Sequence, residues 1–353
     1  VDGTLDFLSG PDWLSRLRAA RHQLETQGPG ISVVPIAEML AVGGSDRVMS
    51  GLGRIDDLVR RGMLTSAMEE AMLALTSAPT YLALHERMAD ILIRSGRLDG
   101  GLVKLATIAE TYRVRGEVEQ ASGAYRAILQ HAPIDMSARS RLVELLTQQG
   151  RVAEALQQHI ELADLYRQLA QIDEARQTLA EAQKLAAQAS VDRSMQVEIL
   201  QQMADIDLSR LDWRRALRGF QDILGLDPSD DKARTQVIDL AFRLGQEDVA
   251  AAELDRYLGH LVQSGRGADA LNSLEEMARE HPGKQALHAR LAEAYRAAGR
   301  KADAIAQYDA LGEIQLDAGN VSDAIRTIRT ILDLNPPDKT GYQELLRNLE
   351  ASR

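Results

Sequence analysis

The histidines are the first residues to consider for metal binding or proton transfer, but their spacing fits no known site. They are His22, His85, His131, His159, His260, His281 and His288. None begins an HExxH pattern, which would place two zinc ligands on one face of a helix. His159 falls where a large packing residue is expected, so we interpret it as a core or boundary residue. No metal site is predicted.

Other catalytic patterns are also missing from the sequence. There is no cysteine, which excludes thiolate catalysis, disulfides and Cys-based zinc sites. No GxSxG motif occurs, and Gly51 and Gly53 neither match a phosphate-binding loop nor follow a predicted strand. The acidic residues lie on polar helical faces and form no recognisable catalytic pair. We therefore expect no enzymatic activity and no cofactor.

One local run of basic residues is the candidate binding site. Its six members are Lys284, His288, Arg290, Arg296, Arg300 and Lys301. Such a run can bind an anionic group of a partner, or it can be a helix face in water. The rest of the chain is acidic, with a net charge of −11 at pH 7 and a pI near 5.2. This charge disfavours nucleic acid and favours a protein partner with exposed Lys or Arg.

The composition predicts helices. Hydrophobic residues make up 45% of the 353 residues and aromatic residues only 4%, while Ala, Leu, Arg, Glu and Gln, which favour helices, are abundant. No apolar run reaches the roughly 18 residues of a membrane span. With no cysteine, a reducing compartment is favoured, and the cytoplasm is expected. Because the sequence begins at Val1 rather than Met, we expect either a trimmed chain or part of a longer polypeptide.

A recurring turn organises most of the chain. Ten turn residues share one surrounding pattern: Gly62, Gly96, Gly116, Gly150, Ala170, Leu211, Gly245, Gly265, Gly299 and Gly319. Five residues after each turn stands a very small residue, and nine and twelve residues after it stand mostly large apolar ones. These offsets share one face of a helix. Glycine can adopt the left-handed conformation that reverses the chain between two helices.

The turns alternate between two spacings. The step is 34 residues from Gly62 to Gly96 and 20 from Gly96 to Gly116, and this alternation recurs along the chain. Prolines such as Pro79 and Pro133 end a helix 17 residues after some turns. Where no proline follows, the helix runs on to the next turn. Each 54-residue module is therefore expected to hold three antiparallel helices, the middle one shared by two hairpins.

These hairpins resemble tetratricopeptide repeats. Two copies fit the pattern best. The first consists of Tyr112, Gly116, Ala121, Tyr125 and Pro133, and the second of Tyr295, Gly299, Ala304 and Tyr308. The resemblance covers about residues 48 to 350. Departures are Ala170 and Leu211 at turns, Asp207 and Gln315 where Tyr or Leu is expected, and the 20-residue steps.

The resemblance implies an all-α fold, a right-handed α-solenoid of antiparallel helix hairpins, and a surface that binds a peptide or a protein. We predict a non-enzymatic interaction scaffold. The alternative is a sensory module that binds a small peptide or metabolite and changes its superhelical pitch. Members of the family that bind chaperone carboxylates carry a clamp of Lys, Asn and Arg, but the matching positions here are Ala106, Glu110, Ser140 and Glu144.

Three regions are expected along the chain. Residues 1–45 form an N-terminal arm or atypical cap, in which Trp13, Leu14, Leu17 and Leu24 share one helical face. That helix either packs onto the first repeat or docks on a membrane surface or partner. Residues 46–189 form a first subarray, and residues 190–353 a second that ends in a capping helix. Between Ala170 and Leu211 the step is 41 residues, which predicts a longer loop or a hinge.

Overall fold

The fold is all-helical over residues 45–189 and 191–351, the part of the chain that the structure, a computed structural model, describes. Every regular element in these residues is an α-helix, and successive helices pack as hairpins of an α-solenoid, as predicted. The predicted N-terminal arm or cap falls on residues outside this description. The chain divides into two compact units, residues 1–189 and 190–353.

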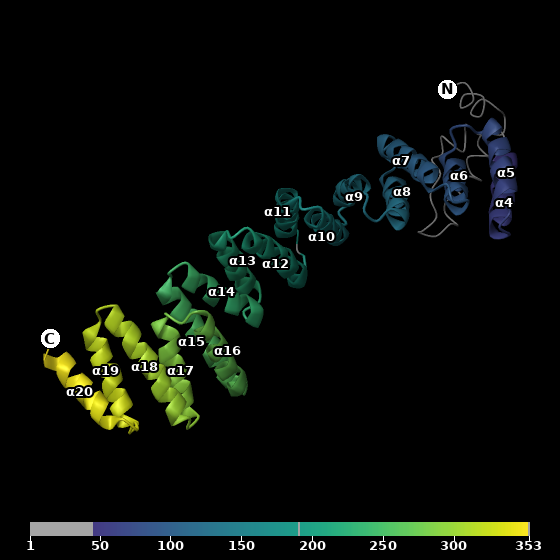
Figure 1. The fold of residues 1–353 in the computed structure, drawn as a ribbon. Coiled ribbons are helices and arrows are strands. Elements are labelled where there is room, and N and C mark those ends of the chain that lie inside the picture. Colours follow the sequence, from purple (N-terminus) through teal and green to yellow (C-terminus); the bar gives the residue numbers. More distant parts are fainter. Residues whose placement is uncertain (1–44, 190, 352–353) are drawn as a thin grey trace. The chain divides into compact units, whose positions relative to one another are not determined.

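The first unit contains one hairpin followed by two three-helix modules (Figure 1). The hairpin consists of α4 (Ser45–Arg60) and α5 (Leu64–Ser77). The first module consists of α6 (Leu82–Arg94), α7 (Leu98–Val114) and α8 (Val118–His131). The second consists of α9 (Met136–Gln148), α10 (Val152–Gln168) and α11 (Ile172–Gln188). Each helix packs against the next in sequence.

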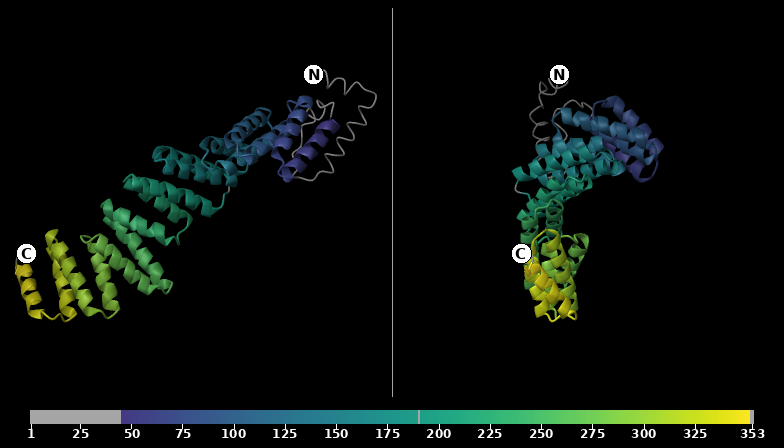
Figure 2. Two further views of the ribbon diagram at one scale, coloured as in Figure 1. Left: turned by 45° about the vertical axis from the view of Figure 1, so that its right-hand side comes forward. Right: turned by 60° about the vertical axis from the view of Figure 1, so that its left-hand side comes forward.

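The second unit has the same organisation and one extra helix. Its hairpin consists of α12 (Arg193–Ser209) and α13 (Trp213–Leu226). Its modules are α14 (Asp231–Arg243), α15 (Glu247–Gln263) and α16 (Gly267–Glu280), then α17 (Gln285–Ala297), α18 (Lys301–Asp317) and α19 (Val321–Asp333). Helix α20 (Lys339–Ala351) packs on α19, and Figure 2 shows the two side by side in yellow.

All ten predicted turn residues have a positive φ angle. The eight glycines lie between 71° and 81°, and Ala170 and Leu211 adopt 58°. At Gly96 the backbone N–H donates to Ile93 O at 3.0 Å, and the N–H of Arg97 donates to Leu92 O at 2.9 Å. This pair of bonds is the usual way in which a left-handed residue ends a helix. The predicted chain reversals are confirmed.

The small residue five positions after each turn is buried in every copy. The ten residues are Ala67, Gly101, Ala121, Ala155, Ala175, Ala216, Ala250, Ala270, Ala304 and Ala324. The residues at offset nine, such as Leu105 and Phe220, are buried beside them, and most of those at offset twelve are as well. The core of each unit therefore follows the predicted pattern, in which a small residue lets two helices approach and a large one fills the space beside it.

The 41-residue step does not contain a longer loop, so that prediction is wrong. The connection between α11 and α12 spans residues 189–192, as short as the connection 132–135 between α8 and α9. The extra length lies in the helices: α11 is three residues longer than α8, and α12 is four residues longer than α9. Asp192 stands at the N-cap position of α12 but makes no capping hydrogen bond with its side chain; its carboxylate instead accepts a hydrogen bond from the Ser194 hydroxyl.

No helix among the described residues is long and apolar enough to span a membrane.

Candidate functional site

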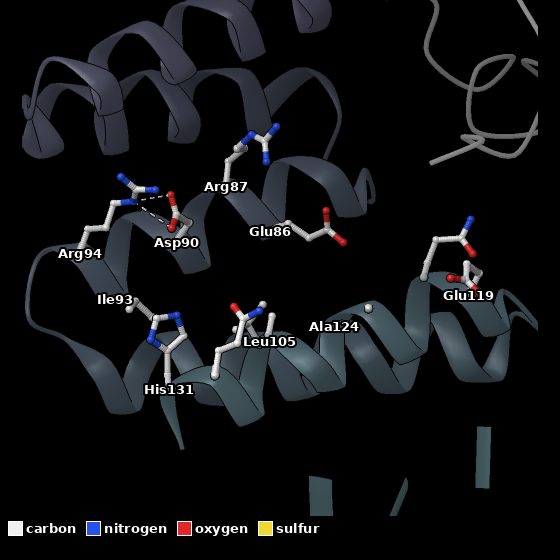
Figure 3. A pocket seen from close by; sticks show the side chains of 13 residues that line it. Glu86, Arg87, Asp90, Ile93, Arg94, Leu105, Glu119, Ala124 and His131 are labelled. Carbon is white, nitrogen blue, oxygen red and sulfur yellow. Dashed lines mark hydrogen bonds and ion pairs between the residues drawn. The ribbon is translucent and has the colours of Figure 1, made fainter. Parts of the chain in front are cut away.

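One candidate site is a groove in the first unit, which we call the α6–α8 groove. It lies between the first and third helices of a module and has a volume of about 830 Å³. Figure 3 shows α6 with Glu86, Asp90 and Ile93 on one side and α8 with Ala124 and His131 on the other. Leu105 of α7 also lines the groove, at its apolar base.

The 20-residue step between Gly96 and Gly116 produces this groove. The two reversals make α6 and α8 both antiparallel to α7, so they flank the same helix and run in the same direction. Small residues of α8, namely Gly123, Ala124 and Ala127, line the groove. A Cβ atom added at Gly123 would meet no heavy atom within 4 Å, so the space in front of α8 is open.

The charged residues on α6 mostly have partners. Arg94 pairs with Asp90 at 2.8 Å, and Arg87 pairs with Asp56 of α4 at 2.7 Å. Burial raises the pKa of Glu86, while a hydrogen bond from the Tyr112 hydroxyl favours its charged form. The groove therefore offers an apolar base with a polar wall of mixed charge on α6.

A corresponding groove occurs in the second unit, and we call it the α14–α16 groove. Its volume is about 490 Å³, and it lies between the first and third helices of the module α14 to α16. Leu208 of α12 and Trp213 of α13 extend it on one side. Its polar residues include Asp239 and Arg243 of α14 and Glu276 and Glu280 of α16. The repeat thus builds the same kind of groove in each unit.

The predicted basic residues lie in α17 and α18 or immediately before them, and three of the six have acidic partners. Lys284 pairs with Glu247 at 2.6 Å, and Arg290 forms two bonds to Asp255 at 2.6 and 2.7 Å. These pairs reduce the charge that is available to a ligand.

The other four predicted residues differ in exposure. Arg300 pairs with Asp303 and Glu275 and lies 4.3 Å from the ring centre of Tyr295. His288 is buried, and its Nε2 donates to Pro282 O at 2.8 Å. Arg296 and Lys301 are exposed. Of the six side chains, one is therefore buried and three have acidic partners.

His288 belongs to a recurring contact that the sequence analysis missed. In four modules a basic side chain on the first helix donates to the carbonyl of a proline six residues earlier. The pairs are His85 with Pro79, Arg139 with Pro133, Arg234 with Pro228, and His288 with Pro282. The signal was present as a fixed spacing from each proline. These residues anchor the connections between modules, so we assign them a structural role.

One cluster among the described residues has the composition of a metal site, at the end of α16. Ligand atoms of Asp239, Glu280 and His281 lie within 4.8 Å of one another. However, Arg243 donates to both carboxylate oxygens of Asp239, at 3.0 and 2.8 Å, and His281 Nε2 lies 2.7 Å from Asp239 Oδ1. Because a guanidinium already neutralises Asp239, we assign no metal here.

His159 is buried, as expected for a packing residue, and burial lowers the pKa of its imidazole. Within the part of the chain that the structure describes, its Nδ1 atom has no hydrogen-bond partner, and His159 lines neither of the two grooves described above. The interpretation of His159 as a core residue is confirmed.

Family models of the tetratricopeptide repeat match two parts of the chain, residues 107–163 and 261–317. The first match contains the reversals at Gly116 and Gly150, and the second contains those at Gly265 and Gly299, so each holds one 34-residue step. A search of curated proteins found no match.

Several solved structures are similar to this chain. The TPR2AB domain of yeast Sti1, solved with pHSP90, is 15% identical over 83% of this chain and 100% of its own, with a TM-score of 0.31. The apo quorum sensor NprR of B. thuringiensis is 17% identical over 95% of this chain and 97% of its own, with a TM-score of 0.33. YrrB, a TPR protein with an unusual peptide-binding site, is 14% identical over 61% of this chain and 87% of its own, with a TM-score of 0.24.

Such low values transfer no ligand or partner to this chain. The family assignment depends instead on the two family-model matches and on the ten reversals with their buried small residues. The chain therefore contains tetratricopeptide repeats, in residues 107–163 and 261–317.

Proposed function

We propose that this chain is a non-enzymatic scaffold that binds a segment of a partner protein in the grooves of its three-helix modules. Tetratricopeptide repeats typically mediate binding to peptides and proteins, and their families are generally non-catalytic. The observation that carries the proposal is the α6–α8 groove, which combines an apolar base with a polar wall. An apolar side chain of the partner would fill the base, while polar groups of its backbone would face α6.

The open space at Gly123 allows a direct test. A Gly123→Trp variant would fill the groove from α8 without a clash at the Cβ atom, because nothing lies within 4 Å of that position. The matched control is Gly100→Trp, since Gly100 also lies in a helix with nothing within 4 Å but does not line the groove. Both variants should fold with the helical circular dichroism of the parent chain.

The measurement is quantitative mass spectrometry of proteins captured from lysate of the source organism by each immobilised chain. We expect the parent and Gly100→Trp to retain the same partner and Gly123→Trp to retain at least tenfold less of it. Equal capture by both variants would place binding elsewhere on the chain. No specific capture, together with a saturable rise in melting temperature on adding a small metabolite, would favour the sensory alternative.

A further inference from the structure

The α14–α16 groove differs from the α6–α8 groove in the charge of its third helix. Glu276 and Glu280 of α16 line it, and both side chains are exposed. Counted from the reversals Gly265 and Gly116, the matching residues of α8 are Ala127 and His131. Two carboxylates thus stand where the first groove has a methyl group and an imidazole.

Each groove has an equivalent ion pair on the first helix of its module. Asp239 pairs with Arg243 at 2.8 Å on α14, and Asp90 pairs with Arg94 at 2.8 Å at the matching positions of α6. In each groove the two charges of this pair cancel each other. The Glu276 and Glu280 carboxylates therefore decide the electrostatic character of the α14–α16 groove, and they make it acidic.

An apolar wall also lines the α14–α16 groove. Leu208 of α12, Trp213 of α13 and Met277 of α16 contribute to it, and Trp213 is partly buried against the core of α12 to α14. A lysine or arginine side chain combines an apolar stem with a cationic end, so it can cover such a wall while its charge reaches a carboxylate. The indole of Trp213 adds a face that attracts cations.

We propose that the α14–α16 groove binds a lysine or arginine side chain of the bound partner, with its stem against Trp213 and its charge beside Glu276 and Glu280. This inference deepens the proposed scaffold function and rests on it. It also assigns different chemistry to the two units: the α6–α8 groove accepts an apolar side chain, whereas the α14–α16 groove selects a basic one.

Trp213 provides the reporter for the test. The chain has two tryptophans, Trp13 and Trp213, so a Trp13→Phe background leaves only the groove residue. The probe is a capped peptide, Ala-Leu-Lys-Ala-Leu-Lys, titrated at low salt while Trp213 fluorescence is recorded. A second peptide carries norleucine, a neutral residue with a similar apolar stem, in place of each lysine.

We expect a saturable fluorescence change with the lysine peptide and at least fivefold weaker binding of the norleucine peptide. The double variant Glu276→Gln and Glu280→Gln should weaken lysine-peptide binding by at least fivefold, and 0.5 M NaCl should do the same for the parent. The matched control is the double variant Glu313→Gln and Glu344→Gln, which removes the same charge from two exposed carboxylates outside both grooves and should leave the affinity unchanged.

Equal binding of the two peptides, or an unchanged affinity of the double variant, would overturn the inference. The proposed function has a separate outcome: if Gly123→Trp loses the captured partner while the lysine peptide does not bind, the scaffold stands and only this inference fails.

Discussion

Two adjacent glycines of α7 show how finely single residues set the helix packing. A Cβ atom added at Gly101 would overlap Cγ1 of Ile93 and lie 3.1 Å from the backbone oxygen of Ala89, both on α6. A Cβ atom at Gly100 would meet nothing within 4 Å. Gly101 stands where all nine other copies have alanine, so α6 and α7 approach more closely here than a methyl group allows.

We therefore expect opposite effects from the same substitution. Gly101→Ala should lower the free energy of unfolding by about 1 to 3 kcal/mol, because the helices must separate or Ile93 must leave its rotamer. Gly100→Ala should raise it by about 0.5 to 1 kcal/mol, because alanine favours an exposed helix. Urea unfolding followed by circular dichroism measures both. If Gly101→Ala were more stable than the parent chain, the space between α6 and α7 would be large enough for a methyl group.

At the scale of single residues, the sequence predicts what depends on local spacing. The ten reversals and their small neighbours are readable because one backbone conformation and one packing distance recur. Ion pairs between helices cannot be predicted from local spacing. Arg290 meets Asp255 across 35 residues, and Lys284 meets Glu247 across 37, so neither pair has a local signature. The predicted basic stretch could therefore not be recognised as partly neutralised.

Among the elements, α20 depends on few contacts. The structure gives it no buried residue, and it lies at the end of the second unit against α19. The Tyr342 hydroxyl donates to the Asp309 carboxylate, whose two oxygens both lie at 2.8 Å, and so ties α20 to α18. Burial, followed by this hydrogen bond, raises the pKa of Tyr342 to about 12.

Removing this hydroxyl should loosen the C-terminal helix. Tyr342→Phe should lower the local stability of α20 by about 1 kcal/mol, measured as faster amide hydrogen exchange in α20 but not in α15. The bond also predicts a pH effect. Because the folded pKa of Tyr342 exceeds the unfolded value of 10.0, the stability it contributes is fully present below pH 10 and is lost as pH rises through about 12.

The phenylalanine variant is the control for this pH effect. A difference titration of the parent chain against Tyr342→Phe, followed by phenolate absorbance, should isolate one tyrosine that ionises near pH 12. If that tyrosine ionised near pH 10, or if exchange in α20 did not change, the helix would be held by other contacts.

Helix lengths were predictable where the turns were evenly spaced. The 20-residue steps predicted the long shared helices, and α7, α10, α15 and α18 each have 17 residues. The 41-residue step was interpreted wrongly because helix-favouring and loop-favouring residues mix in the stretch before Arg193. Sequence spacing gives the total length between two reversals but does not divide it between helix and connection.

At the scale of the whole molecule, the repeat pattern predicts the kind of fold but not the grooves. A groove between the first and third helices of a module exists because two reversals 20 residues apart make them flank one middle helix. Its chemistry comes from residues that the pattern leaves free to vary, such as Ala127 and Glu276. A pattern shared by all copies cannot reveal what differs between them.

The account depends most on ten left-handed reversals that divide the chain into hairpins, and Ala170 and Leu211 test this claim. Both adopt a φ of 58°, which is strained for any residue except glycine, and Leu211 is 72% exposed, so it buries little. If the reversals exist, Ala170→Gly and Leu211→Gly should each raise the free energy of unfolding by about 0.5 to 1 kcal/mol. Gly150→Ala should lower it by about 1 kcal/mol.

The decisive measurement is the free energy of unfolding of the two glycine variants and of Gly150→Ala in urea, with the parent chain as reference. Stabilisation by both new glycines and destabilisation by Gly150→Ala is the predicted result. Within a continuous helix the signs would be reversed, because glycine costs about 0.5 to 1 kcal/mol there relative to alanine. Reversed signs would contradict the hairpin array and every groove that depends on it.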